Sequence, residues 1–136
     1  MNTKILKTLS SVFLFIFLSN ELLADQGISS DQILIGMHTD ISGPASMIGK
    51  QSVDGANMRF SEFNENGGAF GRTIKFIVED HQYTVPRAVQ AANKLLRKDK
   101  VAFMMGALGT PMNNAVMTDQ LAMNVPNLFP LTAARS

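Results

Sequence analysis

The sequence contains no cysteine, no tryptophan and a single tyrosine among its 136 residues. Without cysteine the chain can form no disulfide, no thiolate metal site and no lipid-modified N-terminal cysteine. It also lacks an excess of either charge, since 12 Lys and Arg stand against 11 Asp and Glu, for a net charge of +1. This balance offers no basic surface, so we expect no nucleic acid among its partners.

The N-terminal apolar run is too short to cross a bilayer. It extends over seven residues, Val12 to Leu18, whereas roughly 20 are needed for a membrane-spanning helix. Lys4 and Lys7 precede the run, and a basic start before a short apolar stretch is typical of a secretory signal peptide. We therefore predict that residues 1–24 are a signal peptide cleaved after Ala24. A buried N-terminal helix or a short membrane anchor is the alternative.

Strands and helices are predicted to alternate along residues 25–136. Continuous apolar runs predict buried strands, and apolar residues three or four apart predict helices with one buried face. The expected strands are 33–37, 73–80, 101–105 and 126–131, and the expected helices are 51–66, 86–99 and 110–123. This alternation predicts an α/β fold with a doubly wound, mostly parallel sheet, in which the second strand lies nearer an edge.

Four loops are expected where such a sheet binds ligands, at the carboxyl ends of its strands. They cover residues 39–50, 81–85, 106–111 and the chain from 132 onward. The loop from Gly106 to Pro111 is the strongest candidate. Its glycines allow close approach of the backbone, and the helix that follows offers free N–H groups to a carboxylate. Thr110 either contacts such a ligand or only caps this helix.

The residues form no catalytic or metal-binding pattern. His38 and His81 have no second histidine at helical spacing, so we expect both to be polar surface residues at strand ends. Asp40 lies beside Ser42, but the chain has no G-x-S-x-G turn and no histidine in the required order. We therefore expect no enzymatic activity, no cofactor and no metal.

A series of short motifs resembles a known family in both order and spacing. The motifs are Ile35-Gly36, Ser42-Gly43-Pro44, Asp54-Gly55-Ala56, Asn64 to Gly68, Gly71-Arg72, Val78-Glu79-Asp80, Ala92 to Leu95 and Pro130 to Ala134. Each motif is weak alone, but together they resemble the N-terminal part of the periplasmic branched-chain amino-acid-binding proteins of ABC transporters. The resemblance covers residues 31–136.

The resemblance implies a type 1 periplasmic-binding fold, in which two α/β lobes close over a small solute. Residues 25–136 would form an incomplete first lobe, an N-terminal fragment of a longer receptor. The ligand-binding residues that it implies are Ser42, Ile48, Tyr83, Gly109, Thr110, Thr132 and Ala133. Ile48 stands where relatives often have an aromatic residue. Tyr83 matches a tyrosine of some relatives, and packing is its alternative role.

The function implied is capture of a small solute in the periplasm for delivery to an ABC permease. The solute would be an amino acid such as leucine, isoleucine or valine, or a related carboxylate or amide, and the full-length protein would be a monomer. A ligand-sensing regulator on the same fold remains open. So does a secreted α/β enzyme whose catalytic residues lie beyond Ser136. We expect the fragment alone to bind no solute with useful affinity.

Overall fold

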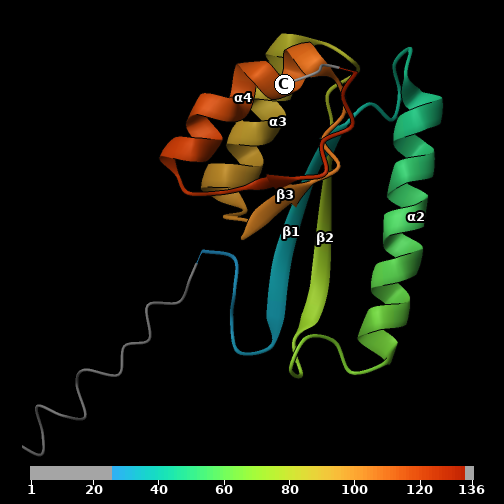
Figure 1. The fold of residues 1–136 in the computed structure, drawn as a ribbon, viewed down its shortest axis with the longest axis vertical. Helices are drawn as coiled ribbons and strands as arrows, with labels where there is room; N and C mark the ends of the chain where they lie inside the picture. The colour runs from blue at the N-terminus through green and yellow to red at the C-terminus, as the bar shows by residue number, and fades with distance from the viewer. Residues whose placement is uncertain (1–25, 134–136) are drawn as a thin grey trace, which may run out of the picture.

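Four apolar segments pair side by side into a parallel sheet, as the computed structural model of residues 26–133 shows (Figure 1). The strands are β1 (Gln32–Thr39), β2 (Thr73–Asp80), β3 (Phe103–Met105) and β4 (Asn127–Leu128). Their order is β2-β1-β3-β4 and every pairing is parallel. The predicted parallel sheet is confirmed, with β2 at an edge. Because β2 and β3 flank β1 on opposite sides, the strand order reverses between β1 and β3.

Helices cover both faces of the sheet. They are α2 (Ser46–Glu65), α3 (Val85–Asn93), the π-helical turn η1 (Lys94–Lys98) and α4 (Thr110–Ala122). Helix α2 lies on one face, and α3 and α4 lie on the other (Figure 1). The α2 layer is held to β2 by the rings of Phe60 and Phe76, whose centroids are 5.2 Å apart. The side chain of Asn64 also bonds the N–H of Ile74 at 2.7 Å and its carbonyl at 2.9 Å.

The main core lies between the sheet and the α3–α4 layer. Its buried members are Ala92, Leu95, Leu96, Val101, Met104, Val116 and Val125. Leu34 and Ile77 pack against them from β1 and β2. Alternate residues of neighbouring parallel strands point to the same face, which explains why these side chains meet. The predicted buried face of the second helix, which includes Ala92 and Leu96, is confirmed.

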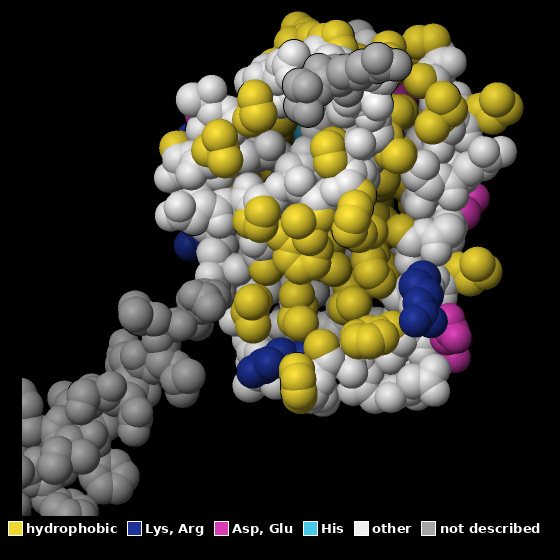
Figure 2. All heavy atoms as spheres, viewed as in Figure 1, with side chains coloured by type: hydrophobic (Ala, Val, Ile, Leu, Met, Phe, Trp, Pro, Cys, Tyr) yellow, Lys and Arg dark blue, Asp and Glu magenta, His cyan; other side chains and the backbone are white. Residues whose placement is uncertain are grey.

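The opposite sheet face is covered less completely. The pairings of Ile35 with Phe103 and of Met105 with Leu128 place these four residues on the side of α2. Helix α2 packs on β2, so the strip over β3 and β4 reaches the surface, where Leu128 is 39% exposed. Figure 2 shows apolar side chains gathered in this area, between α2 and the α3–α4 layer.

Helix α2 begins five residues earlier than expected, at Ser46 rather than Gln51. The carboxylate of Asp40 accepts the N–H groups of Gly43 at 2.5 Å and Ala45 at 2.7 Å, which forms a tight turn directly before the helix. Gly49 lies inside the helix, where a Cβ would stand 1.8 Å from the carbonyl oxygen of Asp40. The end of the loop expected over residues 39–50, which includes Gly49, is therefore helical, and that expectation was wrong. Glycine is needed there for close packing.

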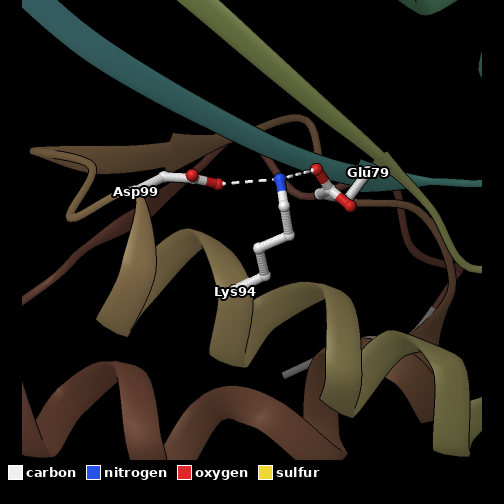
Figure 3. Close-up of polar contacts among 3 residues, drawn as sticks. All are labelled: Glu79, Lys94 and Asp99. Atoms are coloured by element: carbon white, nitrogen blue, oxygen red, sulfur yellow. Dashed lines mark hydrogen bonds and ion pairs between the residues drawn. The ribbon is translucent and has the colours of Figure 1, made fainter.

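A three-residue ion cluster joins η1 to the end of β2 (Figure 3). The ammonium group of Lys94 contacts the carboxylate of Glu79 and lies 3.1 Å from that of Asp99. The hydrogen bond from Lys94 to Glu79, and then that to Asp99, raise the pKa of Lys94. The lysine therefore stays charged at neutral pH, and it holds the start of the π-helical turn against the sheet.

Within residues 26–133, no helix is both long enough and apolar enough to span a membrane. The predicted signal peptide, residues 1–24, lies outside the described residues. It stays a prediction.

Candidate functional site

A pocket of about 400 Å³ lies at the carboxyl edge of the sheet. The loop after β3 reaches this edge because the N–H of Leu108 bonds the carbonyl of His38, the last-but-one residue of β1, at 3.2 Å. The same loop pairs with the chain after β4, through Gly109 N–H to Leu131 at 3.0 Å and Leu131 N–H to Ala107 at 2.9 Å. The pocket therefore lies where the strand order reverses, which is the usual ligand position in open α/β sheets.

Six of the seven expected site residues line this pocket: Ile48, Tyr83, Gly109, Thr110, Thr132 and Ala133. The seventh, Ser42, does not, because its hydroxyl donates to the Asp80 carboxylate at 2.5 Å, at the end of β2. The first loop instead reaches the pocket through Ile48, which lies in the first turn of α2. Leu108, Pro111 and Leu131 also line the pocket and were missed. Each is a direct sequence neighbour of an expected residue.

The start of α4 differs from the expected cap. Gly109 is the capping residue, and Thr110 makes no capping hydrogen bond. Gly109 has a φ of 95°, a conformation that favours glycine, and an added Cβ would lie 3.3 Å from the Tyr83 ring. The side chain of Asn113 holds the turn by donating to the carbonyls of Ala107 and Gly109. Capping, the alternative role for Thr110, is therefore wrong, and Thr110 lines the pocket.

The two histidines are fully buried beneath the pocket, so their expected place on the surface is wrong. His81 Nδ1 accepts the N–H of Tyr83 at 3.0 Å, so the ring proton lies on Nε2, 3.1 Å from the carbonyl of Leu108. The ring of His38 is 5.5 Å from that of His81 between centroids. Neither ring nitrogen of His38 has a hydrogen-bond partner among the described residues.

Burial keeps both imidazoles uncharged at neutral pH. It lowers the pKa of His38 to about 4, with a smaller contribution from repulsion by the His81 ring in its protonated form. Burial also lowers the pKa of His81, against the opposite effects of the Leu108 carbonyl and then Asp40 and Asp80. The pocket therefore has two neutral rings beneath it.

The carboxylates near the pocket are engaged elsewhere. Burial raises the pKa of Asp80, but hydrogen bonds from Ser42, Ile41 and Gln82 outweigh burial and lower it. Asp40 accepts the backbone N–H groups of the turn before α2. Among residues 26–133, no charged side chain lines the pocket. It can therefore recognise a ligand through backbone groups, threonine hydroxyls and apolar contacts.

The described residues assemble no catalytic set. No group of three or more His, Asp or Glu side chains within residues 26–133 could hold a metal ion. Ser42 and Asp80 are paired, but both nitrogens of the neighbouring His81 ring are bonded to backbone groups of Tyr83 and Leu108. The arrangement suits binding rather than nucleophilic chemistry.

The class of protein follows from comparison with known families. The sequence profile of the periplasmic binding protein family matches residues 32–134. This chain belongs to that family, whose members are binding proteins rather than enzymes and are periplasmic.

Two relatives show which branch of the family the chain resembles. It is 29% identical over 83 residues to the leucine-, isoleucine-, valine-, threonine- and alanine-binding protein of Pseudomonas aeruginosa; the match covers 61% of this chain and 22% of the relative. It is 30% identical over 95 residues to the Leu/Ile/Val-binding protein BraC3 of Rhizobium johnstonii; this match covers 68% of this chain and 24% of the relative. The chain thus spans less than a quarter of these relatives.

Solved structures share the fold. The branched-chain amino acid transporter substrate-binding protein LivJ from Streptococcus pneumoniae, in complex with isoleucine, has a TM-score of 0.73 at 23% identity, covering 78% of this chain and 30% of that one. A fatty acid ABC transporter substrate-binding protein from Thermomonospora curvata has a TM-score of 0.70 at 26% identity, and the match covers 85% of this chain and 28% of that one. The type 1 periplasmic-binding fold is therefore confirmed for residues 26–133.

Proposed function

We propose that this chain supplies one half of the binding site of a periplasmic solute receptor that delivers an amino acid to an ABC permease. The observation that carries the proposal is the pocket at the carboxyl edge of the sheet, where loops after β2, β3 and β4 meet the start of α2. The curated relatives support the solute class, since their names specify aliphatic amino acids. In this proposal residues 25–136 belong to the first lobe of a two-lobe receptor.

The polar groups of the pocket suit the charged end of an amino acid. Thr110 offers a hydroxyl and an N–H at the start of α4, where helix N-termini favour a carboxylate. Its neighbour Pro111 has no N–H, so Thr110 supplies the first N–H of this helix. Thr132 brings a second hydroxyl from the chain after β4. We assign these two residues to the carboxylate and ammonium groups of the solute.

The remaining lining residues suit an aliphatic side chain. Ile48, Tyr83, Leu108 and Leu131 contribute apolar surface, and burying such surface favours a branched-chain solute by about 0.8 kcal/mol per CH₂ group. Gly109 and Ala133 leave room for the solute because their side chains are small or absent. Ser42 has no direct contact in this assignment and positions the first loop through Asp80.

The location and partners follow from the same proposal. A signal peptide in residues 1–24 would export the chain to the periplasm, where the receptor would act as a monomer and dock on the permease when loaded. No cofactor is needed, because the solute is bound and released unchanged.

The test is a calorimetric titration of the receptor that carries this segment. Leucine, isoleucine and valine should bind saturably with micromolar or tighter affinity, whereas palmitate should not bind. Palmitate is the informative comparison because a structural neighbour is named for fatty acid transport. Binding of palmitate with no binding of the three amino acids would refute the proposed solute.

A further inference from the structure

His81 bonds two separate loops of the pocket at once. Its Nδ1 accepts the N–H of Tyr83, in the loop after β2, and its Nε2 donates to the carbonyl of Leu108, in the loop after β3. Tyr83 and Leu108 both line the pocket. The imidazole is fully buried, so water cannot easily replace either bond. The relative position of the two loops thus depends on one side chain.

The Tyr83 loop is held in an unfavourable backbone conformation. Gln82 and Tyr83 have φ values of 49° and 55°, in the left-handed region that residues other than glycine rarely adopt. Such conformations persist only where surrounding contacts impose them. The contacts here are the bond from Tyr83 N–H to His81, the bond from Gln82 N–H to Asp80 at 3.0 Å and the bond from Thr84 N–H to the His81 carbonyl at 2.9 Å. Of these, only the first holds the N–H of Tyr83 itself, so its loss removes the contact that fixes this residue.

Four titratable groups face His81, from each element packed around it. They are His38 on β1, Asp40 after β1, Asp80 at the end of β2, and Tyr83 in the next loop. Asp40 and Asp80 are held by backbone N–H groups, and the His38 ring has no hydrogen-bond partner among residues 26–133. Asp80 also accepts the N–H of Gln82, but hydrogen bonds lower its pKa, so it stays charged in mild acid. His81 is therefore the group whose proton uptake opposes an existing bond to the Tyr83 loop.

Protonation of His81 has a specific geometric effect. A second ring proton would lie on Nδ1, directly opposite the N–H of Tyr83, so two donors would face each other. The bond from Nε2 to Leu108 would survive, because that nitrogen already carries its proton. Acid therefore releases the Tyr83 side of the pocket and leaves the Leu108 side in place.

We propose that His81 is a positioning residue that fixes Tyr83 against the Leu108 loop, and that its protonation opens this side of the pocket and weakens solute binding. The identity of the solute rests on the proposed function. The release of the loop is independent of that function, because it depends on bonds within this chain alone.

The composition of the chain makes this release measurable without any solute. Tyr83 is the only tyrosine, there is no tryptophan, and His38 and His81 are the only histidines. Tyrosine emission and the imidazole proton resonances can be followed in the 136-residue chain from about pH 8 to about pH 4. We expect Tyr83 emission to change in one step with the His81 resonance, before the far-ultraviolet circular dichroism is lost. A Tyr83 change that coincides with global unfolding would overturn the proposal.

Two variants and one control assign the step. In His81→Asn the side-chain oxygen can still accept the Tyr83 N–H, two residues ahead, without titrating. His81→Gln is the second variant, with a longer side chain that also cannot titrate. It provides the same test if His81→Asn does not fold. Both should lose the Tyr83 step. His38→Gln removes the other buried imidazole and should keep it. The proposal fails if the step persists in both His81 variants or disappears in His38→Gln.

Leucine affinity of the receptor gives the functional outcome. Below the pKa of His81, the leucine Kd should rise about tenfold per pH unit, because the solute binds the form with one proton fewer. The profile should be flat in His81→Asn. If the Tyr83 step follows His81 but leucine does not bind at neutral pH, the proposed solute is wrong. If leucine binds with no dependence on His81, the positioning role is wrong.

Discussion

His38 carries a fully buried imidazole whose two nitrogens have no hydrogen-bond partner among residues 26–133. Its ring lies next to that of His81, whose nitrogens are both bonded. Unpaired buried polar groups each destabilise a fold by about 1 to 3 kcal/mol. Since burial lowers the pKa of His38 to about 4, its stability contribution depends on pH.

We predict that acid weakens the fold through His38. Its folded pKa is below the ordinary value of 6.5, so the unfolded chain binds more protons between these two pH values. Stability is therefore full above pH 6.5 and falls as the pH drops toward 4, by about 3 kcal/mol at 1.36 kcal/mol per pH unit. Urea unfolding followed by circular dichroism at about pH 7.5 and about pH 4.5 measures the loss.

The matched variant is His38→Leu, which keeps a similar volume and cannot titrate. It should be about 1 kcal/mol more stable than the wild type at neutral pH, because it removes the unpaired nitrogens. It should also lose less stability in acid. An equal loss in both proteins would show that His38 does not cause the acid sensitivity.

The pocket residues were easier to predict than the histidines. Thr110, Thr132 and Gly109 lie in loops whose position follows from the order of strands and helices alone. The burial of His81 depends on the loop after β3, which is distant in sequence and lies over the end of β1. A local alternation of polar residues at a strand end contains no information on that contact. Ser42 was placed in the correct loop but points to Asp80 instead of the pocket.

At the scale of elements, the junction between β1 and α2 sets the position of Ile48. The Asp40 carboxylate closes the turn, and Gly49 lets the helix approach the end of the strand. The sequence predicted all four strands and all three long helices, because their apolar patterns are strong. It missed the first turn of α2, because glycine is unfavourable within a helix. The need for glycine at position 49 comes from its close contact with the Asp40 carbonyl, which the local pattern does not show.

A pair of glycine substitutions in α2 tests this junction. Gly49→Ala should destabilise the fold by about 2 kcal/mol, because its Cβ would overlap the Asp40 carbonyl, 1.8 Å away. Gly55→Ala is the control in the same helix, since nothing lies within 4 Å of its Cβ position. It should stabilise the fold by about 0.5 to 1 kcal/mol through helix propensity. Equal effects of the two substitutions on urea unfolding would contradict close packing at Gly49.

In the whole molecule, the pocket formed by residues 26–133 is open to solvent. Ile48 is 50% exposed, Tyr83 41% and Leu131 37%, although all three line the pocket. Relatives of this family are more than four times as long as the segment that they share with this chain. Both observations support the proposal that a second lobe completes the site around the solute.

We predict that the 136-residue chain alone binds leucine far more weakly than the receptor that carries it. Half of the contacts would be absent, and the solute would stay exposed to water on one side. A calorimetric titration of leucine into the chain should show no micromolar binding. Micromolar affinity in the isolated chain would mean that its own pocket is sufficient, and would overturn the two-lobe proposal.

In the proposed receptor the pocket formed by these loops holds the solute, and substitutions of two threonines test this assignment. Their substitutions should leave the fold intact, because Thr110 makes no capping bond and both residues line the pocket and lie outside the hydrophobic core. Thr118→Ala is the control, since Thr118 is exposed on α4 and does not line the pocket.

The measurement is the leucine Kd of the receptor by calorimetry, with circular dichroism to confirm folding. In Thr110→Ala and in Thr132→Ala the Kd should rise about tenfold or more, the effect of losing a hydrogen bond to a charged group. In Thr118→Ala it should equal the wild-type value. Unchanged affinity in both pocket variants would contradict the assignment of this pocket as the solute-binding site.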